Sequence, residues 1–136
     1  MRRIVVDTNC LLMMIPRQSP YRKVWDAFLR GTIVFCVSNE ILEEYHELLS
    51  QKVALSIADN VLSLMLTQRN LELIVPCYRF GLIQSDVDDN KFVDCAIAAN
   101  ADYLVSNDKH FRILQGIPFP KVNVVCLNDF SKQFVL

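Results

Sequence analysis

The sequence lacks the patterns that build metal sites from sulfur and nitrogen ligands. Its five cysteines contain no CxxC pair, and neither histidine, His46 or His110, is grouped with them. A structural zinc site is therefore not expected. Because the number of cysteines is odd and most lie in apolar runs, we interpret them as reduced core residues of a cytoplasmic protein. They are Cys10, Cys36, Cys77, Cys95 and Cys126.

Long apolar runs and an excess of charge of either sign are also absent. No stretch of about 18 apolar residues occurs, so we expect no membrane-spanning helix. The apolar start of the chain is broken at residues 7–9, which argues against a signal peptide. The formal net charge is −1, from 14 Lys and Arg against 15 Asp and Glu. This balance excludes a strongly basic nucleic-acid binder and leaves room for a local basic patch.

Length and hydrophobic content favour one compact unit. The chain has 136 residues, of which 52% are hydrophobic and 21% charged. A domain of this size buries enough surface to fold without a disulfide or a structural metal. No repeat, linker or low-complexity segment interrupts the sequence. We predict that residues 1–136 form a single domain.

Short β-branched runs alternate with amphipathic segments along the chain, which is typical of an α/β fold with a parallel sheet covered by helices on both faces. Ligands bind such sheets beyond the carboxyl ends of the strands, so the residue after each strand is informative. The predicted strands are 4–6, 32–37, 71–75, 103–105 and 122–127. The predicted helices are 19–31, 38–49, 56–68, 88–100, 109–114 and 129–134, and residues 77–87 form a loop.

Two acids stand at the ends of predicted strands. Asp7 directly follows the first strand, and Asp108 follows the fourth across Ser106 and Asn107. Each alone is equally well explained as a turn or helix-cap residue. If the two strands are neighbours, however, both carboxylates enter one crevice and repel each other. Proteins usually offset the repulsion within such a cluster by binding a divalent cation.

Helical geometry selects a third acid, from the segment after Ser38. The apolar face of this helix is centred near Tyr45, and Glu44 falls about 100° from that centre. The other acids of the helix project farther toward solvent. Glu44 is therefore the acid best placed to reach a buried rim, although a solvated position at the edge of the helix remains an alternative.

The helix that begins near residue 88 supplies the fourth acid. Asp89 projects onto the middle of the apolar face, at the end of the helix that favours negative charge. Asp94 projects about 140° away from the centre of that face. We therefore favour Asp89 as the site residue, with Asp94 or Asp88 as the alternatives.

Four segments of the chain resemble the motifs of PIN-domain nucleases, and most closely the prokaryotic toxins of toxin–antitoxin systems related to VapC. These segments are residues 4–9, 38–44, 86–92 and 101–108. Their order and spacing match the family over residues 1–127. Ser106 matches the family's Ser or Thr before the last acid, whereas Asn107 stands where this branch often has Gly.

The resemblance implies a three-layer α/β/α fold with a five-stranded parallel sheet. It implies an endoribonuclease that depends on Mg²⁺ or Mn²⁺ and has a protein antitoxin as its partner, and it leaves a homodimer open. The four acids of the family correspond to Asp7, Glu44, Asp89 and Asp108, as both catalytic and metal-binding residues. We expect the first, third and fourth to bind the ion directly or through water, and Glu44 to complete the site or orient the attacking water.

Hard oxygen ligands favour Mg²⁺ or Mn²⁺ over Zn²⁺ in such a site. Local cations near the motifs are expected to contact the phosphates of RNA. These cations are Arg17, Arg22, Lys23, Lys91, Lys109 and Arg112. His110 lies two residues past Asp108, and we interpret it as an exposed helix residue rather than a general base.

Two other functions remain to be weighed. In the first, the acids are only helix caps, and the fold is a catalytically inactive PIN-like module that binds protein or RNA. The surface for a protein partner is then the apolar patch of residues 38–68. In the second, the chain is a receiver-like domain phosphorylated on aspartate. The second is disfavoured because residues 7–9 lack the second Asp of a DxD motif and no Lys directly follows a late strand.

Overall fold

A computed structural model describes residues 1–135 of the chain. Helices and strands alternate along most of this length. In order they are β1 (Arg2–Val6), α1 (Thr8–Met14), α2 (Arg22–Leu29), β2 (Ile33–Val37), α3 (Asn39–Lys52), α4 (Leu55–Thr67), β3 (Leu71–Leu73), the 3₁₀ helix η1 (Val87–Asp89), α5 (Asn90–Ala98), β4 (Tyr103–Val105), the 3₁₀ helix η2 (Lys109–Gly116), β5 (Val124–Val125) and α6 (Leu127–Phe134).

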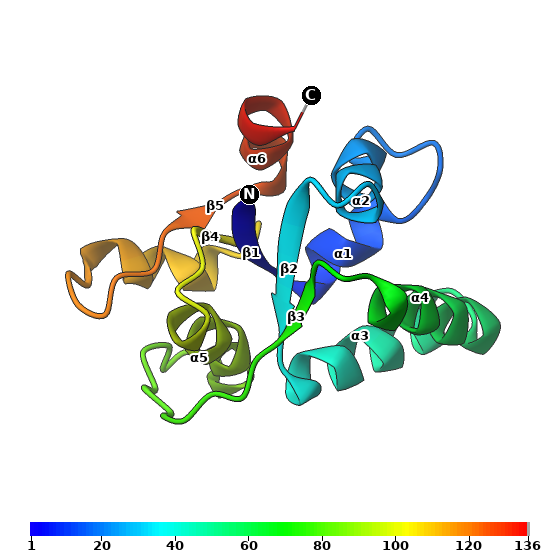
Figure 1. The fold of residues 1–136 in the computed structure, drawn as a ribbon. Helices are drawn as coiled ribbons and strands as arrows, with labels where there is room; N and C mark the ends of the chain where they lie inside the picture. Colours follow the sequence, from blue (N-terminus) through cyan, green and yellow to red (C-terminus); the bar gives the residue numbers. More distant parts are fainter. Residues whose placement is uncertain (136) are drawn as a thin grey trace.

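The strands form one parallel sheet in the order β3-β2-β1-β4-β5. Helices α1 to α4 lie to one side of this sheet and α5 to the other (Figure 1). The predicted three-layer α/β/α fold is thus confirmed. The chain builds outward from β1 to β2 and β3, and then returns to place β4 on the other side of β1. The carboxyl ends of β1 and β4 therefore flank the point where the strand order reverses, which is where such sheets bind ligands.

The central strand is buried because both of its faces are covered. Ile4, Val5 and Val6 are at most 1% exposed, as expected for a strand in the middle of a parallel sheet. On β2, Phe35 stacks on Phe28 of α2 with 4.2 Å between the ring centroids. These apolar contacts stabilise the sheet and hold the ends of its strands in place.

Helix α1 was missed from the sequence. The polar residues 7–9 indicate a turn after the first strand, but Asp7 instead occupies the N-cap position of a helix that begins at Thr8. Cys10, Leu11 and Met14 are buried on its inner face at helical spacing. The strand thus passes directly into a helix at Asp7, and the third and fifth strands are shorter than predicted.

The prediction of reduced core cysteines is confirmed for three of the five. Within residues 1–135 all five cysteines are free, and Cys10, Cys36 and Cys95 are buried, whereas Cys126 is half-buried and Cys77 is exposed rather than part of the core. Burial raises the pKa of the Cys10 and Cys95 thiols to about 12, which keeps them protonated. No helix in the described part of the chain is long and apolar enough to cross a membrane.

Asn70 links α2 to the sheet through its side-chain amide. Its Nδ2 donates to the Phe28 carbonyl at 2.7 Å and to the Ile33 carbonyl at 2.6 Å. We expect Asn70→Ala to lower the free energy of unfolding by about 1–2 kcal/mol, because two carbonyls lose a donor. Urea denaturation measures this change. Asn60→Ala, on the exposed face of α4, is the control and should change the free energy by less than about 0.5 kcal/mol.

Candidate active site

Asp7 lies where β1 ends and α1 begins. Its side chain is only 7% exposed. Its backbone N–H donates to the Val105 carbonyl at 2.9 Å, which fixes the end of β1 to the neighbouring strand β4. The Ser106 hydroxyl donates to Asp7 Oδ2 at 2.8 Å. The sheet itself therefore sets the position of this carboxylate.

Asp108 is held beside Asp7 by the same hydroxyl. The Asp108 N–H donates to Ser106 Oγ at 3.0 Å, so this one oxygen connects the two acids. Asp108 caps η2, and its Oδ1 accepts from the His110 N–H at 2.9 Å. The short polar stretch after β4 therefore joins two acids that are 101 residues apart in the sequence.

Glu44 reaches the same region from α3. This helix begins at a Ser38 cap, and the buried Tyr45 anchors it by donating its hydroxyl to the Val6 carbonyl. Next to this anchor, the Glu44 carboxylate accepts from the Thr8 hydroxyl, one residue past Asp7. Glu44 is half-buried at the edge of its helix, as helical geometry predicts.

Asp89 stands at the junction of η1 and α5, with its side chain 15% exposed. Its Oδ2 is fully buried and has no hydrogen-bond partner among residues 1–135, and the same holds for Nδ1 of His110. These two atoms are 3.5 Å apart, and the same Nδ1 is 3.3 Å from Asp108 Oδ1. Possible ligand atoms of Asp86, Asp89 and His110 all lie within 4.8 Å of one another.

Burial and the charges of neighbouring acids destabilise the charged forms of Asp7 and Asp89. Burial raises the pKa of Asp7, opposed by the hydrogen bonds from Ser106 and the Thr8 backbone, and the charges of Asp108 and Glu44 raise it further. Burial also raises the pKa of Asp89 to about 6, and the charges of Asp86, Asp108 and Asp7 add to this shift, whereas the nearby His110 ring opposes it. The structure thus brings the four predicted acids into one electrostatic cluster.

The two alternatives to Asp89 lie elsewhere. Asp94 points away from the apolar face, as expected, but it is buried, because the segment before η1 covers this side of α5. The Phe80 N–H donates to its Oδ1 at 3.1 Å. Asp88 is 76% exposed and pairs with Lys91. Neither is among the acids whose charge acts on Asp7 or Asp89.

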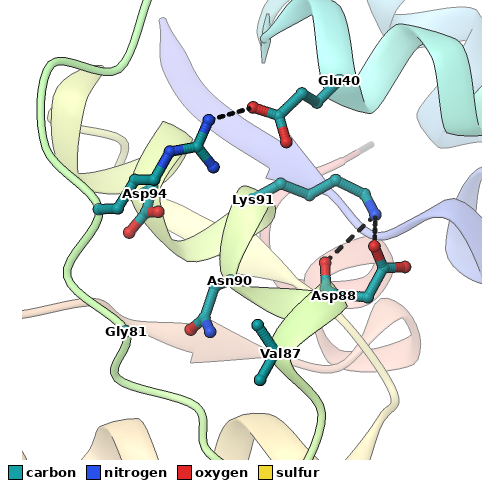
Figure 2. Close-up of a pocket in the computed structure, with 8 residues that line it drawn as sticks. Glu40, Gly81, Val87, Asp88, Asn90, Lys91 and Asp94 are labelled. Atoms are coloured by element: carbon teal, nitrogen blue, oxygen red, sulfur yellow. Dashed lines mark hydrogen bonds and ion pairs between the residues drawn. The ribbon is translucent and has the colours of Figure 1, made fainter.

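A cavity of about 390 Å³ lies beside α5, and none of the four predicted acids lines it (Figure 2). Asp88 and Lys91 form part of its wall, and Arg79 pairs with Glu40 across it at 3.3 Å. Its remaining lining residues are Gly81, Val87, Asn90 and Asp94. Five of its eight lining residues are charged, which distinguishes this cavity from the pockets that usually take small molecules.

Two interpretations from the sequence need correction. His110 is not a simple exposed helix residue, because its ring lies between Asp89 and Asp108. Lys91 is not free to contact phosphate, since its ammonium group is paired with Glu44 and Asp88. Both errors have the same origin. The contacts of His110 and Lys91 join segments that are far apart in the sequence, and helical periodicity does not reveal which distant segments lie side by side in the fold.

The donor set fits a divalent cation. An unpartnered, buried carboxylate oxygen that faces like charges is costly without a positive partner. Carboxylate oxygens are the ligands that Mg²⁺ and Mn²⁺ prefer, and an imidazole nitrogen is also accepted by Mn²⁺. Among residues 1–135, Asp86, Asp89 and His110 are the group whose possible ligand atoms lie close enough together to share such an ion, with Asp108 next to His110.

The fold and this arrangement of acids define a class of protein. The family model described as "PIN domain" matches residues 3–110, and the chain belongs to this family.

The fold of the chain is similar to that of one solved structure, a chain in the crystal structure of VapBC2 from Rickettsia felis bound to a DNA fragment from the VapBC2 promoter. That likeness has a TM-score of 0.63 at 20% identity and covers 91% of this chain and 98% of the other. No curated protein sequence gives a significant match. Membership in the PIN family argues against the receiver-like alternative.

Proposed function

We propose that the chain is a metal-dependent endoribonuclease of one domain, residues 1–136, that hydrolyses RNA phosphodiester bonds with Asp7, Glu44, Asp89 and Asp108. The observation that supports this most strongly is the buried Asp89 oxygen that accepts no well-formed hydrogen bond within residues 1–135, set among acids whose charges raise the pKa of Asp89. Such an arrangement is typical of a functional site rather than of helix caps.

In this proposal Asp7, Asp89 and Asp108 hold one or more Mg²⁺ or Mn²⁺ ions, and Glu44 completes the site or orients the attacking water. A bound divalent ion would supply the positive charge that offsets charge developing on the phosphate. The Ser106 hydroxyl favours the ionised form of Asp7 by donating a hydrogen bond to its carboxylate. The same oxygen accepts from the Asp108 N–H and so fixes the backbone at Asp108. Both acids are thereby oriented before any ligand arrives.

Several of the predicted cations remain candidates for contact with RNA phosphates. Arg17, Lys109 and Arg112 are exposed, and the last two lie on η2 directly after Asp108. Arg22 is already engaged by Asp26 at 3.1 Å. Phosphate contacts of this kind position RNA without reading its sequence.

Metal removal tests this proposal. We expect the protein to cleave a labelled single-stranded RNA with Mg²⁺ or Mn²⁺, and to lose at least about 100-fold in rate in excess EDTA, because the site loses the charge that balances its acids. Activity should return when Mn²⁺ is restored. Cleavage that persists in EDTA, or its absence with every divalent ion on several RNAs, would contradict the proposal.

A protein partner is supported by the outer surface of the α3–α4 pair. Several apolar side chains are exposed along α4 and in the turn that joins it to α3. They include Val53, Leu55, Ile57, Leu64 and Leu66. A similar fold occurs in a structure of VapBC2 with DNA, and we propose that this surface binds a protein antitoxin or a second copy of the chain, so that the nuclease is the toxin of a toxin–antitoxin system. A cytoplasmic location stays a prediction based on the free cysteines.

The same surface also suits the second candidate function, an inactive PIN-like module that binds protein or RNA. The two candidates differ in the behaviour of the acids. If the acids are only caps, Mn²⁺ should not bind in the micromolar to millimolar range, and their replacement should affect stability alone.

A further inference from the structure

Lys91 carries the positive charge that lies closest to Glu44. Its side chain is 8% exposed, and its Nζ is 2.7 Å from Glu44 Oε1 and 2.9 Å from Asp88 Oδ1. The Asp88 carbonyl accepts from the same Nζ at 3.2 Å. The ammonium thus has three oxygen acceptors, one for each of its N–H groups. Figure 2 shows it bent toward Asp88 at the edge of the cavity.

Glu44 differs from the other acids of the cluster in how its oxygens are used. One oxygen pairs with Lys91 and the other accepts from the Thr8 hydroxyl. Asp89, by contrast, keeps a buried oxygen without a partner among residues 1–135. The protein therefore satisfies both oxygens of Glu44 with its own donors, whereas the buried oxygen of Asp89 has only the His110 ring nitrogen near it, at 3.5 Å.

The charge on Lys91 is maintained inside the protein. A lysine side chain is ordinarily protonated at neutral pH, and the buried ammonium group of Lys91 is balanced by ion pairs with Glu44 and Asp88. The ammonium group also lies over the Phe92 ring, with Nζ 5.4 Å from the ring centre. A full positive charge therefore stays beside Glu44 at neutral pH.

We propose that Lys91 is a positioning residue that holds Glu44 outside the coordination shell of the divalent ion, and that its ammonium group occupies the place where Glu44 and Asp88 would otherwise bind a second ion. The chain then takes a single divalent ion, on the side of Asp7, Asp89 and Asp108. This inference rests on the proposed function, and it assigns Glu44 to the orientation of water rather than to direct metal binding.

The first test counts bound ions. Mn²⁺ binding, followed through the electron paramagnetic resonance signal of free Mn²⁺, should give one ion per chain for the wild type. Lys91→Met keeps the apolar stem but removes the charge, and we expect it to bind two ions. Lys91→Arg should restore a count of one. Lys132→Met, at an exposed lysine in the last turn of α6, is the matched control and should also bind one.

The second test compares acids without disturbing the lysine. Glu44→Gln should change the Mn²⁺ affinity of the first ion by no more than about threefold, whereas Asp89→Asn should weaken it at least about tenfold. Circular dichroism melting curves establish that each variant is folded. This comparison does not depend on Lys91→Met being stable.

The outcomes separate this inference from the proposed function. Two ions in the wild type, one ion in folded Lys91→Met, or a loss in Glu44→Gln as large as in Asp89→Asn would each overturn the role of Lys91 while leaving a metal-dependent nuclease intact. A wild type that binds no Mn²⁺ would overturn the proposed metal dependence and this inference with it.

Discussion

Asp7→Asn is expected to lower the rate of metal-dependent RNA cleavage by about 100- to 1000-fold without unfolding the protein. The amide has nearly the same shape as the carboxylate, and its oxygen still accepts from the Ser106 hydroxyl. It carries no charge, however, and so it binds a divalent ion poorly. Single-turnover cleavage of a labelled RNA at saturating Mn²⁺ measures the rate.

Asp94→Asn is the matched control for this experiment. Asp94 is also a buried acid on an element near the cluster, and it accepts a hydrogen bond from a backbone N–H, which asparagine can still accept. We expect Asp94→Asn to keep the cleavage rate within about threefold of the wild type. Equal losses in both variants would indicate a general structural effect, and an unchanged rate in Asp7→Asn would remove Asp7 from the active site.

Asp89→Asn is expected to stabilise the metal-free protein at pH 7.5. The pKa of Asp89 is raised from 3.8 to about 6 by burial and by neighbouring acids, so ionisation favours the unfolded chain. The shift corresponds to about 3 kcal/mol at most, and solvent near the partly exposed side chain reduces it to about 1–2 kcal/mol. Urea denaturation in EDTA should show this gain for the variant.

The gain should depend on pH in a defined direction. The folded state holds the Asp89 proton more tightly than the unfolded state, so wild-type stability falls as pH rises from about 4 to about 6. The advantage of Asp89→Asn is therefore full above pH 6 and fades below it. Asp129→Asn, an exposed acid in the first turn of α6, is the control and should show no gain. A loss of stability in Asp89→Asn at pH 7.5 would mean that the carboxylate is already neutralised within the fold.

The sheet and the cluster of acids could be predicted because they depend on local pattern and topology. Three short apolar runs in the sequence form β1, β2 and β4, the strands around Asp7. The helical spacing of the apolar residues in α3 places Glu44 at a half-buried edge of that helix. Parallel strands then bring their carboxyl ends to one side of the sheet, whatever the details of the loops. Asp7 and Asp108 meet for this reason.

The remaining parts of the site depend on contacts between distant segments. Asp94 is buried by residues 77–83, whose path is not encoded in any periodicity, and Lys91 finds Glu44 only because α5 packs beside α3. The position of His110 follows from the turns of η2. Helix α1 was missed for a different reason, because its polar first turn has the composition of a loop.

The chain before Asp89 is fastened mainly by side chains rather than by a neighbouring strand. The Asn90 amide exchanges two hydrogen bonds of 2.9 Å with the backbone of Ile83, and Asp94 accepts from Phe80. Local release of this stretch would withdraw Asp86 and Asp89 while Asp7 and Asp108 stay fixed on the sheet. One part of the cluster is therefore held by the sheet and the other by side-chain hydrogen bonds. A ligand that binds both parts would stabilise the arrangement in which they lie together.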